Sequence, residues 1–457
     1  MKTKTTNYRW VICGMLFFAT TINYMDRQVL SLTYPGMIEN EFHWDEAMYG
    51  TITGVFSIVY AAAMLFAGKF IDMVGSKKGY LWAIGIWSTG ACLHAVCGIG
   101  TELLTGCGDL KSPEMLQLAA GSKMALAIGT VSVWMFVGAR CILAIGEAGN
   151  FPAAIKVTAE YFEPKDRAFA TAVFNSGCSI GALIAPFAIP LLAKFYGWEM
   201  AFIIIGGLGY IWMGAWVLMY TPNPNLNDTH KEVSVSYGKV FRMREAWALF
   251  LCRLVSDGGW WFFLFWTPMY LSTEFGIKPT DTEGMVLIFV LYLITMLSIF
   301  GGRVPNIFIR KGKSPFQSHI MSMFLFACIP LLGLLAQPAG QFFHSPWAPI
   351  VLIGVLGASH QSWSANMFSV ISDKFSSAST ATVTSLSGAF GGVSNFMLNI
   401  IAGYLFTYAG KTDMVFMGFT GKSAGYMIMF CWCALAYLIG WTLLKLLMKK
   451  EENRDTV

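Results

Sequence analysis

Long apolar segments are the feature that most limits what this chain can fold into. Hydrophobic residues make up 56% of its 457 residues and charged residues only 12%, against about 25% charged residues in soluble domains. A helix needs roughly 20 apolar residues to cross a bilayer, whereas barrel strands are about half as long and alternate in polarity. We therefore predict an all-α membrane protein with twelve transmembrane helices, over residues 10–34, 47–71, 79–100, 122–154, 166–193, 199–221, 246–273, 283–309, 316–337, 346–372, 380–408 and 424–447.

The distribution of positive charge predicts how these helices are oriented. The sequence MKTKTTNYR leads directly into the first apolar run, which we expect to act as its own insertion signal. Lys and Arg are concentrated in the termini and in the loops that follow even-numbered spans. Positive residues stay on the cytoplasmic side, so both termini are predicted to be cytoplasmic. The net charge of +5 is therefore a mark of topology, and we expect no nucleic-acid partner.

A polar interruption near the middle divides the chain. It predicts an N-terminal six-helix half over residues 1–221, a cytoplasmic linker over 222–245 and a C-terminal six-helix half over 246–457. Short echoes link the halves, since Glu160-Tyr161-Phe162 ends the fourth span and Asp373-Lys374-Phe375 ends the tenth. Two pseudo-symmetric halves around a midplane site are the plan of a transporter that works by rocking.

Four charged residues inside apolar runs of the first half point to a function. They are Asp26, Arg27, Arg140 and Glu147. A charge in the bilayer centre is costly unless it faces a partner or water, so such residues mark ion or substrate pathways. Arg140 and Glu147 are about 10.5 Å apart along a helix axis, which suits Arg140 for binding a carboxylate while Glu147 pairs with another helix, plausibly through Arg27. A static structural ion pair is the alternative.

Several segments resemble one known family. The pattern Gly68-x3-Asp72-x2-Gly75-x-Lys77-Lys78 is similar to the loop signature of the major facilitator superfamily, and we expect these five residues to serve gating. Residues 23–28 and 140–156 resemble its anion:cation symporter branch. Segments that resemble hexuronate transporters within that branch are 174–177, 253–268 and 360–366. The chain departs from that pattern at Gly258, where proline is usual, and at Met269, where lysine is common.

The resemblance implies the major facilitator fold and proton-coupled symport of a hexuronate, galacturonate or glucuronate, across the bacterial inner membrane. Arg27 would then hold the substrate carboxylate, for which a guanidinium is well matched. Asp26 and Glu147 would couple transport to protons. We expect a monomer in the lipid bilayer, with a small anionic sugar acid and protons as its partners.

Polar and aromatic side chains in apolar runs are further candidates for substrate binding. Amide groups supply both donors and acceptors for sugar hydroxyls, although hydrogen bonding between helices is an equal alternative. Of the adjacent residues Trp260, Trp261, Phe262 and Phe263, at most one or two can face a cavity. Arg253 and Asp257 can bridge on one helix face. Besides Arg27 and Arg140, the predicted binding residues are Tyr24, Tyr60, Asn175, Trp260, His360, Gln361, Asn366 and Asn395.

The sequence also bears on catalysis and on cofactor binding. The chain has neither nucleophile-elbow spacing nor a phosphate-binding glycine loop, so we expect no enzyme activity, no cofactor and no metal site. The alternatives that stay open are an aldonate, an aldarate or another organic anion as the cargo, sodium in place of protons, and a membrane-embedded sensor. Cys97 and Cys107 flank a loop that faces outward and could form a disulfide there.

Overall fold

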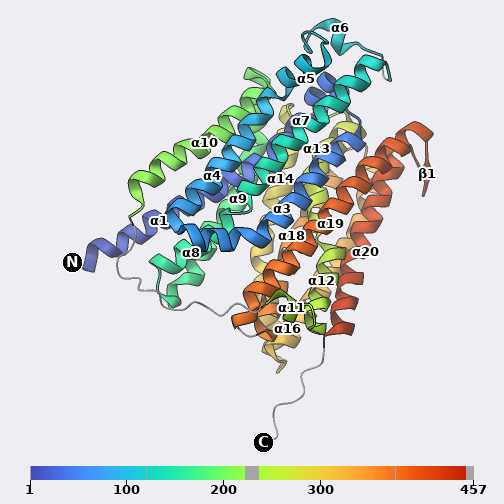
Figure 1. Ribbon diagram of the computed structural model, residues 1–457. Coiled ribbons are helices and arrows are strands. Elements are labelled where there is room, and N and C mark those ends of the chain that lie inside the picture. The colour runs from blue at the N-terminus through green and yellow to red at the C-terminus, as the bar shows by residue number, and fades with distance from the viewer. Residues whose placement is uncertain (1, 120, 222–235, 376, 449–457) are drawn as a thin grey trace, which may run out of the picture.

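The structure is a computed structural model in which nearly all of the chain is helical (Figure 1). It describes residues 2–119, 121–221, 236–375 and 377–448. Most of the predicted linker, residues 222–235, lies outside this description. The elements of the first half are α1 Lys2–Thr33, η1 Tyr34–Ile38, α2 Glu39–Phe42, α3 Glu46–Val74, α4 Ser76–Leu93, η2 His94–Val96, α5 Cys97–Thr105, α6 Pro113–Leu116, α7 Lys123–Glu147, α8 Asn150–Tyr161, α9 Pro164–Tyr196 and α10 Trp198–Met219.

The second half repeats this plan and adds one small strand pair. Antiparallel strands β1 and β2 pair Val415 with Thr420 and Phe416 with Phe419. The elements are α11 Tyr237–Val240, α12 Arg244–Ser256, α13 Gly258–Phe275, α14 Thr282–Thr295, η3 Met296–Arg303, α15 Val304–Ile309, α16 Pro315–Cys328, η4 Ile329–Leu335, α17 Ala336–Phe343, α18 Trp347–Lys374, α19 Ser377–Thr412, β1 Val415–Phe416, β2 Phe419–Thr420 and α20 Lys422–Leu447.

Ten helical segments of the described residues are long and apolar enough to cross a membrane, and they coincide with ten of the twelve predicted spans. The other two predicted spans are α1, with 32 residues, and α18, with 28 residues. Both are long helices packed in the same bundle, but they carry the polar candidates of the first and tenth spans, which lowers their hydropathy. The two helices that are least like lipid-facing spans are thus two that carry the predicted site.

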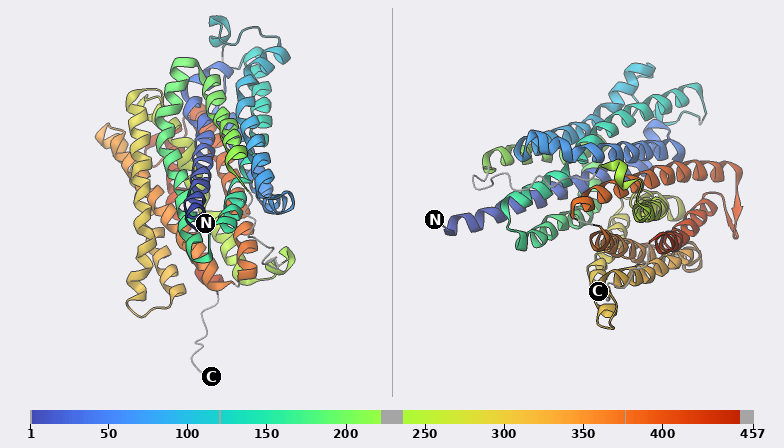
Figure 2. Two further views of the ribbon diagram at one scale, coloured as in Figure 1. Left: turned by 90° about the vertical axis from the view of Figure 1, so that its left-hand side faces the viewer. Right: turned by 60° about the horizontal axis from the view of Figure 1, so that its bottom comes forward.

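The two halves pack against each other in a symmetric way. The blue-to-green helices gather on one side of the molecule and the yellow-to-red helices on the other (Figure 2). Across the seam, α3 packs on α19 and α9 packs on α14. These helices are the second, eleventh, fifth and eighth spans, so exchanging the halves turns one contact pair into the other. The predicted fold class is confirmed in this arrangement.

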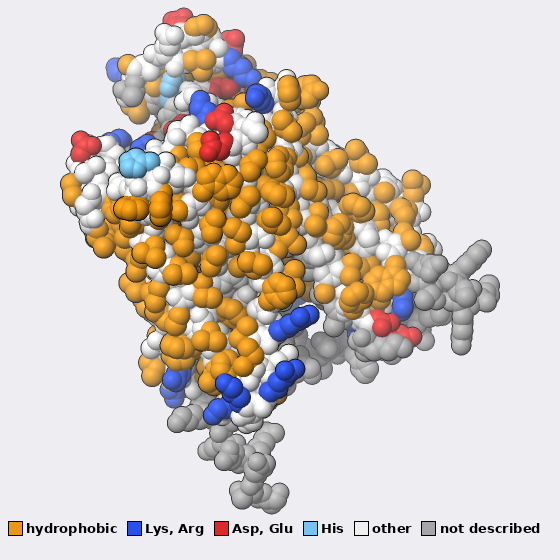
Figure 3. All heavy atoms as spheres, turned by 180° about the vertical axis from the view of Figure 1, so that it is seen from behind, with side chains coloured by type: hydrophobic (Ala, Val, Ile, Leu, Met, Phe, Trp, Pro, Cys, Tyr) orange, Lys and Arg blue, Asp and Glu red, His pale blue; other side chains and the backbone are white. Residues whose placement is uncertain are grey.

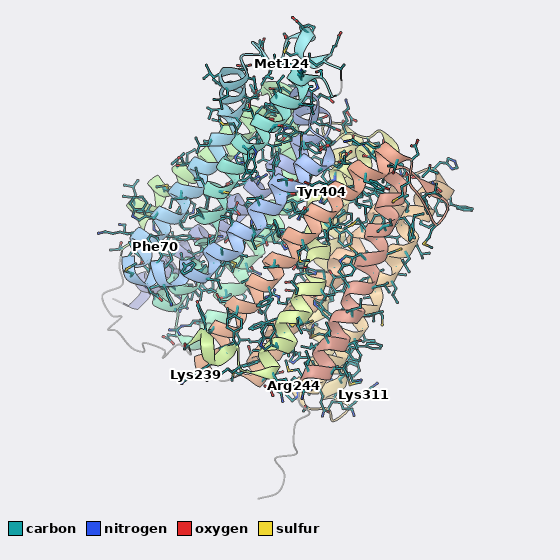
Figure 4. The ribbon with its side chains drawn as sticks, turned by 45° about the vertical axis from the view of Figure 1, so that its right-hand side comes forward. Phe70, Met124, Lys239, Arg244, Lys311 and Tyr404 are labelled. Carbon is teal, nitrogen blue, oxygen red and sulfur yellow. The ribbon has the colours of Figure 1, made fainter. Side chains whose placement is uncertain are left out.

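The two ends of the bundle differ in charge. We call the end where α1 begins and α20 ends the terminal face, and the opposite end the distal face. Lys239, Arg244 and Lys311 lie at the terminal face and Met124 at the distal face (Figure 4). Between the faces the surface is broadly apolar (Figure 3), with side chains such as that of Leu218 86% exposed. This belt fits a bilayer, where apolar side chains need no further cover.

The halves approach each other closely toward the distal face. A Cβ atom on Gly50 of α3 would lie 2.5 Å from the carbonyl oxygen of Asn399 in α19 and 3.0 Å from the Cα of Gly403. Glycine at these positions therefore lets the two backbones touch. Nearby, Glu46 forms an ion pair with Lys422 across the seam, and the Tyr49 hydroxyl donates to the Phe265 carbonyl at 2.8 Å. The distal face is closed by these contacts.

Candidate functional site

A buried ion pair between α1 and α7 forms the centre of the site. Arg27 Nε donates to Glu147 Oε2 at 2.6 Å, and their side chains are 3% and 0% exposed. The predicted pairing of Glu147 with Arg27 is thus confirmed. A buried pair stabilises poorly when compared with apolar packing, because both charges lose their hydration. Its presence therefore needs an explanation other than stability.

Glycines set the position of both partners. A Cβ on Gly146 would lie 2.3 Å from the backbone nitrogen of Trp87 in α4, and one on Gly177 of α9 would lie 2.5 Å from the carbonyl of Phe17 in α1. Only residues without a side chain allow α7 and α9 to approach their neighbours so closely. These contacts fix the depth of Glu147 and the position of α1.

Three aromatic rings surround the Arg27 guanidinium, and they come from both halves of the protein. The guanidinium carbon lies 4.6 Å from the ring centre of Tyr60, 5.3 Å from that of Tyr24 and 5.4 Å from that of Trp261. Cation–π contacts of this kind hold an arginine without using its N–H donors. Trp261 belongs to α13, so this contact joins the first half to the second.

Several polar atoms around this ion pair have no hydrogen-bond partner among the described residues. They include both carboxylate oxygens of Asp26, Arg27 Nη2, Glu147 Oε1, Arg140 Nε and both amide atoms of Asn23. Buried polar groups are nearly always satisfied in folded proteins. A cluster with several exceptions is therefore incomplete without protons, water or a ligand.

Arg140 and Asp26 complete the cluster of charges. Arg140 lies on α7 and is 2% exposed, with its guanidinium carbon 5.4 Å from the ring of Phe56 in α3. Asp26 precedes Arg27 in α1 and is 2% exposed. The first half thus brings two guanidinium groups and two carboxyl groups into one buried region, as predicted.

The predicted residue Asn395 lies in the seam between the halves. Its amide donates to Ser57 Oγ at 2.6 Å, and it is hydrogen-bonded to Asn399 of the same helix. The oxygen of Asn399 accepts from Thr53 at 3.1 Å and from Trp266 at 2.9 Å. This buried network joins α3, α13 and α19, so it couples the halves directly.

The other polar candidates differ in burial and in their hydrogen-bond partners. His360 Nδ1 lies 2.8 Å from the Tyr437 hydroxyl. The His360 ring stacks on the ring of Trp260, with 5.7 Å between the ring centres. Asn366 donates to the Ser362 carbonyl of its own helix at 2.8 Å. Gln361 is half-buried, and Asn175 is exposed. Of the two adjacent tryptophans, Trp261 contacts Arg27 and Trp260 contacts His360.

The second half holds its own charge pair. Arg253 Nε donates to Asp257 Oδ2 at 2.8 Å, one turn away on the same stretch of helix. The Arg253 guanidinium also lies 3.3 Å from Ser387 Oγ and 5.2 Å from the Phe368 ring. At Gly258, where the family pattern departs, the backbone N–H donates to Ser394 Oγ at 3.0 Å, a bond that proline could not make.

The predicted gating residues bind partners in their own half. Asp72 pairs with Lys156 at 3.0 Å, and Lys77 donates to the carbonyls of Val217 and Tyr220 at 3.2 and 2.9 Å. Gly75 has φ of +86°, which favours glycine, and links α3 to α4. A Cβ on Gly68 would meet no atom within 4 Å, and Lys78 is exposed.

The two cysteines that could pair are both free in this structure. Cys97 is buried and Cys107 is half-buried. Their thiols lie close to backbone carbonyls, at 3.4 Å from Leu93 and 3.5 Å from Gly108 respectively. Both thiols therefore have local contacts that do not involve each other.

Comparison with known proteins gives a consistent family. Residues 16–398 match the model of the Major Facilitator Superfamily. The chain is 25% identical to the hexuronate transporter of Escherichia coli (strain K12), over 97% of this chain and 95% of that protein. It is 23% identical to a probable galactarate/D-glucarate transporter of Bacillus subtilis (strain 168), over 99% and 96%.

Among solved structures, the chain resembles a bacterial homologue of the human lysosomal transporter Spinster in an inward-facing, unoccupied conformation. The TM-score is 0.71 at 16% identity, with 99% of this chain and 100% of that chain covered. This similarity supports the fold of two helical halves described above.

Proposed function

This chain belongs to the Major Facilitator Superfamily. We propose that it is a proton-coupled symporter of a hexuronate, either galacturonate or glucuronate. The chain is a membrane transporter by family, and relatives over its full length are named for sugar acids. The proposal adds the cargo, the coupling ion and the residues that serve them.

The observation that carries the proposal is the incomplete coordination of Arg27. One nitrogen of its guanidinium binds Glu147 at 2.6 Å, while Nη2 is buried without a partner beneath the Trp261 ring. A guanidinium presents parallel N–H donors that match the two oxygens of a carboxylate. The substrate carboxylate would take the donors that Glu147 leaves free, and Arg140 would add a second positive charge.

The same cluster supplies two carboxyl groups for coupling to protons. An ionised carboxylate without donors at this depth is costly, so protonation of Asp26 relieves its unsatisfied oxygens. Protonation of Glu147 would release Arg27 toward the sugar acid. Substrate and proton would leave together on the other side, and the Arg27–Glu147 pair would then form again. This order of steps couples the movement of the anionic substrate to that of a proton.

Electrostatics favours proton coupling for an anion that enters a cell. An inside-negative potential opposes each negative charge by about 2.3 kcal/mol per 100 mV. One co-transported proton cancels this term and a second would add a driving force. We assign the terminal face to the cytoplasmic side of a bacterial inner membrane, because its positive residues follow the positive-inside rule. Both termini then lie in the cytoplasm. We propose that the protein acts as a monomer.

The seam residues support alternation between two states. The distal face is closed by the Glu46–Lys422 pair and the contact of Gly50 with Gly403, while Asp72 of the loop motif binds Lys156 within its own half. In the alternate state we expect the distal pair to separate. Asp72 would then be available to contact the second half at the terminal face.

Uptake into proteoliposomes tests the proposal. Protein is reconstituted, an inward proton gradient is imposed, and accumulation of radiolabelled galacturonate is followed with and without a proton ionophore or sodium. We expect accumulation that requires the proton gradient and persists without sodium. Accumulation that requires sodium and ignores the ionophore would contradict proton coupling.

A second cargo class is favoured by one observation. A relative aligned over 99% of this chain is named for galactarate and D-glucarate, which carry two carboxylates, and Arg140 offers a second guanidinium for such a substrate. Competition of galacturonate uptake by a panel of uronates, aldonates and aldarates separates the cases. Stronger inhibition by an aldarate than by either hexuronate would transfer the assignment to that class.

A further inference from the structure

A polar cavity at the distal face lies apart from the charge cluster. Its volume is about 530 Å³, and the lining side chains belong to the end of α13, to α17 and to the residue that follows α17. The lining residues are Tyr270, Glu274, Phe275, Gln337, Gly340, Gln341 and His344. Glu274 is the one charged lining residue when His344 is neutral, so the cavity has a negative character.

Glu274 is held firmly in place. The Ser423 hydroxyl of α20 lies 2.7 and 2.8 Å from its two oxygens, and the Gln337 amide nitrogen donates to it as well. A carboxylate near the start of a helix is favoured by the helix dipole. The bonds from Ser423 and Gln337 and the dipole of α20 explain the position of Glu274, but they leave the rest of the cavity unexplained.

Two buried oxygen atoms on residues that line this cavity have no partner among the described residues. They are Gln337 Oε1 and the Tyr270 hydroxyl, on residues only 1% and 2% exposed. Because the Gln337 nitrogen donates to Glu274, its other amide atom is left as a free acceptor. Buried polar atoms are nearly always hydrogen-bonded in folded proteins, so both oxygens are candidates to bind a ligand.

We propose that this cavity binds a compact monovalent cation, either an alkali metal ion or a primary ammonium group. Both are held by oxygen atoms, and an ammonium group offers three donors without an acceptor. Glu274, Gln337 Oε1 and Tyr270 supply a charge and two neutral oxygens, while the ring of Phe275 offers an aromatic face. A sugar acid would be repelled by Glu274, so the site differs in kind from the one around Arg27.

The position of the cavity gives this cation a role at the distal face. Ser423, which binds Glu274, follows Lys422, which pairs with Glu46 of the first half. The same first turn of α20 therefore carries both the cavity contact and the closure of the seam. A bound cation would stabilise this turn in the closed arrangement.

Thermal unfolding of the purified full-length protein tests the proposal. At constant pH and ionic strength, bulky N-methyl-D-glucamine chloride is replaced stepwise by sodium, potassium or methylammonium chloride. We expect a saturable rise in the apparent unfolding temperature with at least one compact cation. The sodium and methylammonium arms distinguish a metal ion from an ammonium group. Equal responses to all salts would overturn the proposal and leave ordered water as the occupant.

Variants connect the response to these residues. Glu274→Gln should raise the cation concentration at half-effect by about tenfold or more, since it removes the charged ligand. Tyr270→Phe deletes only an unpartnered hydroxyl, so it should fold normally and weaken the response several-fold. Glu283→Gln, an exposed glutamate at the start of α14, is the matched control. A saturable response that survives unchanged in both cavity variants would refute the assignment.

Discussion

The two halves of the protein each contain an arginine–carboxylate pair, but the pairs are built differently. Arg253 and Asp257 lie four residues, about one helical turn, apart in the seventh span with side chains 11% exposed, and Arg253 also donates to Ser387. Arg27 and Glu147 are 120 residues apart and join two helices. Among the four charged groups of the first-half cluster, atoms on every one lack a partner, whereas no atom of Arg253 or Asp257 is among the buried unpartnered ones in the described chain.

We interpret this difference as one between a structural pair and a pair that takes part in transport. A pair within one stretch of helix can persist through a movement of the halves. A pair between helices that leaves donors and acceptors unused is ready to exchange partners with a proton or a ligand. The contrast teaches that incomplete hydrogen bonding, rather than buried charge alone, distinguishes the candidate site.

Loss of the Arg27 guanidinium should have the largest effect. We expect Arg27→Gln to reduce uptake by at least about a hundredfold, since it removes charged hydrogen bonds to the substrate. It also leaves Glu147 buried without its partner, a change that costs about 3–5 kcal/mol of stability. Adding Glu147→Gln should restore the unfolding temperature without restoring the exchange of labelled for unlabelled substrate, which Glu147→Gln alone is expected to retain. Recovery of exchange in that double variant would show that Arg27 has only a structural role.

Neutralising Glu147 should separate coupling from binding. We expect Glu147→Gln to abolish accumulation driven by a proton gradient, while exchange of labelled for unlabelled substrate across the membrane continues. The amide keeps the shape of the carboxylate but cannot carry a proton. Counterflow and gradient-driven uptake are measured on the same vesicles. Normal gradient-driven accumulation in the variant would remove Glu147 from the coupling mechanism.

A smaller effect is expected from the aromatic contact between the halves. Trp261 lies against Arg27, whereas Trp260 stacks on His360. Trp261→Leu should therefore raise the KM for the sugar acid by about three- to tenfold, because a cation–π contact contributes roughly 0.5–2 kcal/mol. Trp260→Leu is the matched control in the same helix, and we expect it to change KM less. The reverse order would place the substrate in the second half.

Comparison with the sequence shows which parts of this site could be predicted. The charged residues were identified because a bilayer makes isolated charge costly, and spacing along α7 favoured a partner for Glu147 on another helix. Trp260 was predicted as a binding residue and that role stays a prediction, but the ring that meets Arg27 is that of Trp261, which periodicity did not indicate. Both lie in one continuous apolar run, and only the rotation of α13 against α1 decides which ring meets Arg27.

The side-chain contacts in the seam between the halves could not be predicted from the sequence either. Asn395 was predicted as a binding residue, and its site role stays a prediction, but its bonds to Ser57 and Asn399 depend on how α3 crosses α19. Phe56 beside Arg140 had no distinguishing signal among 36 phenylalanines. Long-range packing, rather than local periodicity, determines these contacts.

Replacement of the Arg253–Asp257 pair in the second half should change uptake only weakly. We expect the double variant Arg253→Gln/Asp257→Asn to keep uptake within about threefold of the unchanged protein, because replacing both members of a pair leaves no charge unpaired. Each single variant should have a lower unfolding temperature than the double variant. A loss of uptake in the stable double variant as large as that of Arg27→Gln would abolish the contrast between the halves and make Arg253 a second anchor.

The smallest effect on transport is expected at another buried acid, Glu41 of α2, which lies at the distal face and accepts a hydrogen bond from Trp198 at 2.8 Å. Burial raises the pKa of Glu41 from 4.5 to about 7, although the bond from Trp198 opposes the shift. The folded state thus holds this proton more tightly than the unfolded chain, so Glu41 adds stability at low pH that is lost as the pH rises from 4.5 to about 7.

Glu41→Gln should therefore leave unfolding nearly unchanged at pH 5 and stabilise the protein at pH 8 by about 1–3 kcal/mol. Gradient-driven uptake should persist in this variant, because the acid is already hydrogen-bonded and lies apart from Arg27. Unfolding temperatures at both pH values and uptake on the same preparation check the two statements. If Glu41→Gln abolished coupling as Glu147→Gln is expected to do, burial of an acid would be sufficient for the role, and incomplete hydrogen bonding would not be what selects Asp26 and Glu147.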